Sequence, residues 1–222
     1  MFMLRIVMKN TKTWLLDAGV GLSLTIQAQK ATVIDTDFSK GQLTNAQTIR
    51  YKDLVKFHGH SCDGLLEGMQ ALQLGLKELY PEGVFDRTNT RVVSKSSPCL
   101  TDAAVYLTGA RIQYNTFYVD NSIEGLYIIQ RVDNGKAVLV SRNPGVKPPE
   151  IDRQGDLAIQ KKLSYAQLRE LKKMEDAYSA LLRKSDPAIH FTVKVLDHFE
   201  WNPVIKSDFV KTDIINKNVR EQ

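Results

Sequence analysis

Two histidines and one cysteine fall within five residues of the segment KFHGHSCDG, which runs from Lys56 to Gly64. The chain has only four histidines and two cysteines in 222 residues, so half of each type lies in this segment. His58, His60 and Cys62 are spaced i, i+2 and i+4, and in an extended loop this spacing brings two imidazoles and a thiolate to one point. This donor set suits a borderline-soft divalent ion, zinc first, with nickel, cobalt and iron also compatible.

The second cysteine stands in a setting like that of the first. Cys62 lies just before one expected helix, and Cys99 lies in the first turn of another, after Ser97 and Pro98. Free N–H groups and the positive dipole end of a helix N-terminus favour thiolate over thiol. We therefore expect the two sulfurs to lie within about 8 Å of each other, facing one pocket with a histidine. The predicted metal ligands are His58, His60, Cys62 and Cys99.

The residues also allow a different function, either a metal-assisted enzyme or a thiol oxidoreductase that uses the two cysteines. An enzyme needs an open coordination position, which would take water or a small molecule, and a nearby acid or base. The carboxylates nearest in sequence are Asp63, Glu67 and Asp102. Each has a structural interpretation that we favour: a helix cap, a solvated helix face and a partner of the helix dipole, respectively.

Four further residues receive structural interpretations. His190 falls on the polar side of an expected strand, where we interpret it as a surface or pairing residue. His198 lies in the C-terminal segment LDHFEW, from which it could reach the metal site, although a lone histidine is usually structural. Tyr114 and Asn115 stand at the start of an expected strand, where a turn explains them.

The pattern of apolar residues predicts an α+β fold, a mixed sheet with packed helices in a single core domain. Asp133-Asn134-Gly135 separates two β-rich runs and predicts a hairpin. Helices are expected over residues 65–79, 97–110 and 164–183. Strands are expected over residues 90–96, 116–121, 125–132, 136–142 and 188–196.

The N-terminus has the features of an export signal, with Lys9 and Lys12 before an apolar stretch that ends in small and polar residues near Ala28. We therefore predict a signal peptide over 1–28, a polar linker over 29–49 and the α+β domain over 50–222. This places the mature protein in the periplasm or outside the cell; an uncleaved chain would be cytoplasmic. No other stretch is apolar for long enough to span a membrane. The net charge of +5 is scattered, which argues against nucleic-acid binding.

Two ordered motifs resemble the E subunit of formylmethanofuran dehydrogenase and its homologues. FHGHSCDGLLEG is similar to the family's F-H-G-H-x-C-P-G signature, and SSPCLTDAAVYLTGARIQYNTFYVDN is similar to its second cysteine segment. GLYIIQRVDNGKAVLV matches a later hairpin, so the resemblance covers residues 50–145. Asp63 replaces the usual proline, and Ala110 stands where a second cysteine is common. Residues 150–222 have no counterpart in the pattern that we can identify.

The resemblance implies an α+β core, often dimeric, with His58, His60, Cys62 and Cys99 around a metal. In archaeal relatives the subunit accompanies a tungsten or molybdenum enzyme that fixes CO₂ on methanofuran. We expect the metal-binding module to carry over without that chemistry, because function belongs to sites rather than to folds.

Overall fold

This computed structural model describes residues 29–35 and 45–203. Within them, helix α3 (Asp63–Leu79) lies at the centre, and the other elements pack around it. The elements before and around it are β1 (Lys30–Ile34), β2 (Gln47–Arg50), α2 (Tyr51–His58), β3 (Val84–Asp86), β4 (Thr90–Ser94) and α4 (Pro98–Thr108). The later elements are η1 (Ile112–Tyr114), β5 (Phe117–Val119), β6 (Tyr127–Arg131), β7 (Ala137–Arg142), α5 (Pro149–Ile159), α6 (Tyr165–Lys184), α7 (Pro187–His190) and β8 (Phe191–Leu196).

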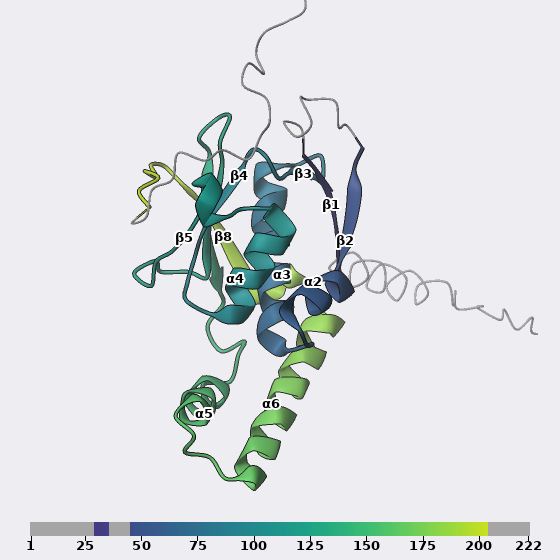
Figure 1. Ribbon diagram of the computed structural model, residues 1–222, viewed down its shortest axis with the longest axis vertical. Coiled ribbons are helices and arrows are strands. Elements are labelled where there is room, and N and C mark those ends of the chain that lie inside the picture. The colour runs from purple at the N-terminus through teal and green to yellow at the C-terminus, as the bar shows by residue number, and fades with distance from the viewer. Residues whose placement is uncertain (1–28, 36–44, 204–222) are drawn as a thin grey trace, which may run out of the picture.

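Two mixed sheets flank α3 (Figure 1). The larger sheet has the strand order β5-β4-β6-β7-β8, in which only the β4–β5 pair is parallel. The smaller sheet has the order β2-β1-β3, with β1 antiparallel to β2 and parallel to β3. This arrangement confirms the predicted α+β class and the hairpin, which pairs Gln130 with Ala137 next to the Asn-Gly turn.

Glycines let α3 approach the larger sheet closely. A Cβ atom on Gly75 would lie 2.6 Å from Val140 Cγ2 and 2.7 Å from Ile129 Cδ1, so only glycine fits without a shift. A Cβ on Gly68 would lie 2.7 Å from the Tyr127 hydroxyl. Most of α3 is therefore buried, and its two ends are fixed relative to the sheet.

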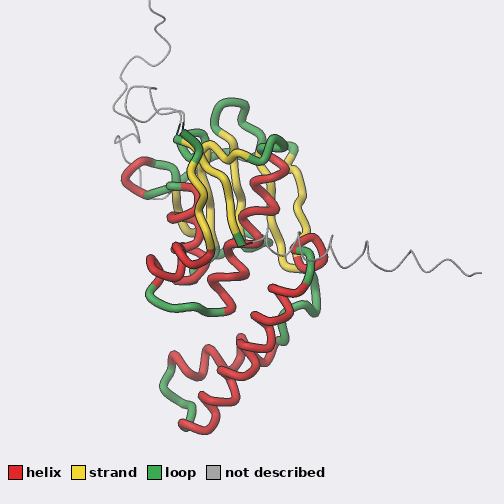
Figure 2. The backbone as a smooth tube through the Cα atoms, turned by 90° about the vertical axis from the view of Figure 1, so that its right-hand side faces the viewer, coloured by secondary structure: helices red, strands yellow, loops and turns green. Residues whose placement is uncertain are grey.

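Helices α5 and α6 form a hairpin that extends away from both sheets (Figures 1 and 2). Ser164 caps α6, and its hydroxyl accepts the Gln167 N–H. Leu171, Tyr178 and Leu182 are buried against the core, whereas Leu168 and Leu181 are exposed. Among the described residues, no helix is both long and apolar enough to cross a membrane.

The segment 29–49, predicted as a polar linker, contains β1 and most of β2. The side chain of Val33 in β1 is fully buried, so this polar-looking segment contributes to the core. Strands of four and five residues carry too few alternations for their sequence to reveal them. The predicted signal peptide, 1–28, lies outside the described residues.

The interpretation of His190 as a surface or pairing residue is wrong as to the surface, because the side chain is buried and hydrogen-bonded. Residues 187–190 form α7 rather than a strand, because Asp186 caps the Ala188 N–H and Pro187 occupies the first helical position. His190 is 3% exposed, and its Nε2 lies 2.6 Å from Ser185 Oγ. Its neighbour Ile189 is 63% exposed. The strand itself begins at Phe191.

We predict that Gly75→Ala destabilises the protein, although alanine is the better helix former. Overpacking against Val140 and Ile129 should cost about 1–3 kcal/mol, more than the gain in helix propensity of about 0.8–1 kcal/mol. Gly155→Ala in α5 is the matched control, because a Cβ there meets no atom within 4 Å. Urea unfolding of both variants checks this; equal stabilisation by both would show that α3 tolerates a methyl group at the sheet.

Candidate metal centre

His58 and Cys62 stand on either side of a three-residue connection between two helices. His58 is the last residue of α2, which Gly59 closes in the left-handed conformation with φ of 99°. Cys62 is the N-cap of α3, and its Sγ accepts the Leu65 N–H at 3.4 Å. The predicted extended loop is therefore a helix end, a short turn and a helix start. The i, i+4 spacing brings the two side chains together through this turn.

Cys99 reaches the same point from the first turn of α4. Ser97 caps that helix, with Oγ accepting the Leu100 N–H at 3.4 Å, and Pro98 opens it, as predicted. A Cβ atom on Gly64 would lie 3.0 Å from both Cβ and Sγ of Cys99. Glycine at this position therefore lets the start of α4 pack against the start of α3, which places the second sulfur beside the first.

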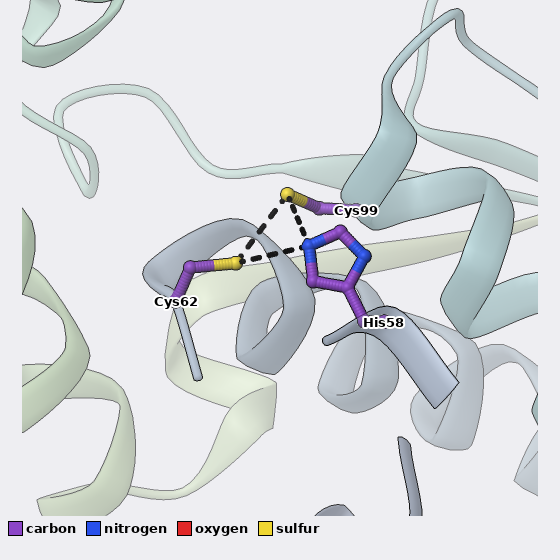
Figure 3. A group of neighbouring side chains, drawn as sticks. All are labelled: His58, Cys62 and Cys99. Carbon is purple, nitrogen blue, oxygen red and sulfur yellow. Dashed lines mark hydrogen bonds between the residues drawn. The ribbon is translucent and has the colours of Figure 1, made fainter. Parts of the chain in front are cut away.

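Three donor atoms converge in this group (Figure 3). The sulfurs of Cys62 and Cys99 are 3.4 Å apart, and His58 Nε2 is 3.7 Å from the former and 3.6 Å from the latter. The expectation that both sulfurs lie within about 8 Å of each other and face one histidine is confirmed. Cys62 and Cys99 are half-buried, and the His58 side chain is 5% exposed.

The spacing fits one tetrahedral ion. Zinc distances of about 2.3 Å to sulfur and about 2.0–2.1 Å to nitrogen put two sulfurs about 3.8 Å apart and a sulfur and a nitrogen about 3.6 Å apart. The observed separations of 3.4 to 3.7 Å differ from these values by a few tenths of an ångström. The side chains of His58, Cys62 and Cys99 could therefore hold such an ion without a change of backbone.

Asp102 orients the histidine. The His58 Nδ1–H donates to Asp102 Oδ2 at 2.8 Å, from one turn further along α4 than Cys99. This hydrogen bond fixes the tautomer in which Nε2 carries a free lone pair, and Nε2 is the atom that faces the sulfurs. Asp102, a candidate acid or base by its nearness in sequence, therefore positions His58 through this hydrogen bond.

The two thiols share one negative charge. The Cys99 hydrogen bond lowers the pKa of Cys62 to about 6, against the effect of burial, with help from the Leu65 N–H and His58. The same contact and burial raise the pKa of Cys99. Burial alone would lower the pKa of His58, but the hydrogen bond to Asp102 and the Cys62 thiolate outweigh it and raise the pKa. Near neutral pH the metal-free pair of Cys62 and Cys99 therefore carries one negative charge and keeps one proton.

The comparison with known families bears on this site. A family model described as "FmdE, Molybdenum formylmethanofuran dehydrogenase operon" matches residues 57–190, more than half of the chain. The chain belongs to the FmdE family. No curated protein matches the chain. The FmdE match begins at the His/Cys segment and reaches the end of α7, so the resemblance extends well past residue 145. Most of the region that the sequence left unplaced, including α5 and α6, is part of the FmdE domain.

The predicted ligand His60 lies outside the converging group, and so does His198, for which the sequence favours a structural role. The ring of His60 lies against that of His58 with 4.6 Å between centroids, so it is adjacent to the donors without being one of the three. His198 is exposed beyond the end of β8 and is not in the group. Asn115 takes the left-handed conformation with φ of 55° and ends η1, which agrees with the turn interpretation.

The other two candidate carboxylates form ion pairs rather than a cap or a solvated face. Asp63 Oδ2 lies 3.5 Å from Lys147 Nζ, and that ammonium also lies 2.7 Å from Asp152. Glu67 is buried and pairs with Arg142, and it accepts the Tyr178 hydroxyl at 3.1 Å. These contacts link α3 to α5, α6 and β7.

Sequence reasoning missed two charged residues beside the site, Lys147 and Glu175. Lys147 comes from the segment before α5, and Glu175 is a half-buried residue of α6. Burial raises the pKa of Glu175, and the negative charges of Asp63 and Cys62 add to that effect. Neither residue belongs to a motif, because each reaches the site only through the packing of the helical hairpin.

We predict that Asp102→Asn weakens metal binding by about 10- to 100-fold while leaving the fold intact. The amide no longer fixes the Nδ1–H tautomer of His58, whereas the side chain keeps its shape. Competition with a chromophoric chelator measures the affinity. Asp133→Asn, at the exposed hairpin turn, is the control. An unchanged affinity would show that His58 is not held through Asp102, or is not a ligand.

Proposed function

We propose that this FmdE protein binds a borderline-soft divalent transition metal, zinc in the first place, through His58, Cys62 and Cys99. The convergence of one imidazole nitrogen and two sulfurs within 3.7 Å of one another supports this most directly. Two thiolates and a histidine suit zinc, and the same set accepts nickel, cobalt or iron. The role we favour is binding or delivery of the ion.

The number of donors favours exchange over a purely structural role. Structural zinc sites usually have four protein ligands, whereas sites with three keep one position for water or a small molecule. Among the described residues, the converging group has three. His60 is the side chain best placed to act as a fourth ligand, because its ring already lies against His58.

The decisive experiment is elemental analysis of the protein purified from its native compartment, with Cys62→Ser beside the parent. Removal of a residue that only hydrogen-bonds to a ligand is expected to lower metal affinity about 10- to 100-fold. Cys62→Ser should lower it further, because it deletes a thiolate ligand. His198→Ala is a better control than His190→Ala, since His198 is exposed and His190 is buried. Full retention of metal by Cys62→Ser would contradict the proposal.

Metal affinity should fall as the pH is lowered from 8 to 5, because protons compete for the same donors. Cys99, whose pKa is raised, must lose a proton to bind throughout this range. As the pH falls, protonation of His58 begins to compete with the metal at or above the reference pKa of about 6.5. Protonation of Cys62 begins to compete near its pKa of about 6. The dependence therefore steepens toward low pH. Titrations with Co²⁺ measure it; a flat profile would place the metal elsewhere.

A metal-assisted enzyme is the second candidate, and Glu175 is the observation in its favour. Burial and the nearby Asp63 raise the pKa of this half-buried carboxyl, which is the direction that favours a general acid. Glu175→Gln should then abolish turnover while metal affinity stays within about twofold, because the residue is not among the three donors. A screen of hydrolase and lyase substrates with the metal-loaded protein tests this. Activity that survives in Glu175→Gln would exclude this role.

Export and self-association are further parts of the proposal. The N-terminal pattern supports cleavage near Ala28 and a periplasmic or secreted protein. N-terminal sequencing of the native protein would find Met1 or Met8 if the segment is retained.

The family resemblance supports a homodimer, and exposed apolar side chains on the hairpin, Ile159, Tyr165 and Leu168, offer it a surface. Light scattering at several concentrations would detect a monomer.

A further inference from the structure

We infer that Cys62 and Cys99 form a reversible intramolecular disulfide in the metal-free protein, so that oxidation switches metal binding off. The inference rests on the proposed function, because it concerns the regulation of the same site. The sulfurs are already in contact at 3.4 Å and point toward each other (Figure 3). A disulfide bond is about 2.0 Å long, so the sulfurs must approach by about 1.4 Å.

The pair is accessible and isolated. Both cysteines are reduced and half-buried, unlike the fully buried cysteines that remain inert. They are the only two cysteines of the chain, so each has one intramolecular partner. Cys62 begins α3 and Cys99 lies in the first turn of α4, so the two sulfurs come from helix starts that the core already packs together.

The oxidant is a low-molecular-weight disulfide, RSSR. One protein thiolate attacks a sulfur of RSSR, which forms a mixed disulfide with the protein and releases one RS⁻. The second protein thiolate then attacks the protein sulfur of that mixed disulfide and displaces the second RS⁻. The two protein thiols lose two protons and two electrons, and RSSR is reduced to two RSH.

Metal binding and disulfide formation exclude each other. The disulfide uses two of the three converging donors and leaves only His58. One imidazole cannot replace three donors in holding the ion. Conversely, a bound ion engages both sulfurs and withholds them from the oxidant. By linkage, the metal protects the thiols, and a more oxidising compartment lowers metal occupancy.

The test treats reduced, metal-free protein anaerobically with oxidised glutathione and then adds Co²⁺. We expect both thiols to disappear, the intact mass to fall by two hydrogens and the protein to stay free of intermolecular disulfides on a non-reducing gel. The thiolate-to-Co²⁺ absorption seen with the reduced protein should be lost in full and should return after reduction with a phosphine. Protein loaded with Zn²⁺ beforehand should react more slowly, by at least about tenfold.

Three variants make the outcomes specific. Cys99→Ser should stop at a mixed disulfide with one glutathione, because the resolving thiol is absent. His58→Ala keeps both thiols, so it should still form the disulfide although its metal affinity falls. His198→Ala should match the parent in every respect.

The results separate this inference from the proposed function. Reduced protein that binds no Co²⁺ overturns the proposed function and the switch together. Reduced protein that binds Co²⁺ but yields only glutathione adducts, intermolecular disulfides or unreacted thiols overturns the switch and leaves the proposed function standing. A complete intramolecular disulfide that still binds Co²⁺ with its original spectrum also overturns the switch.

Discussion

The close packing of α3 against α4 is the constraint on which the site depends. Gly64 leaves room for Cys99, and Gly68 leaves room for Tyr127 and Ala103, so the two helices begin side by side. The Tyr127 hydroxyl donates to the Leu100 carbonyl at 2.9 Å and ties the start of α4 to the larger sheet. The two sulfurs are thus held by the core rather than by flexible loops, which reduces the entropy lost when they bind a common ion.

Much of this could be predicted because the signals are local. Ser97 and Pro98 mark the start of α4, the Asn134-Gly135 turn marks the hairpin, and both cysteines stand next to recognisable helix starts. Each of these features depends on a few neighbouring residues. The convergence of Cys62 and Cys99 followed from such local signals once two helix starts were assumed to share one pocket.

The rest depended on contacts between distant segments. The bond from His58 to Asp102 joins residues 44 apart and exists only because α2 packs beside α4. Glu175 belongs to α6 and Lys147 to the segment before α5, and no local pattern encodes where these parts of the chain pack. The sequence did not predict the short strands β1 and β2 or the helical turn at Pro187, for the opposite reason. They are so brief that tertiary pairing or a single cap decides their conformation.

The charges around the centre explain why it suits an ion. Two thiolates 3.4 Å apart in a half-buried site would repel each other strongly, so the metal-free protein keeps a proton between them. A divalent ion removes that repulsion, because two thiolates, a neutral imidazole and a charge of +2 sum to zero. A disulfide removes it as well, by leaving no charge on either sulfur. Lys147 and Arg142 pair with the nearby carboxylates Asp63 and Glu67 and offset part of their negative charge. The packing of α3 and α4 holds the two sulfurs so close that two thiolates would repel each other. A shared proton, a bound metal ion and a disulfide are three alternative ways to remove that repulsion.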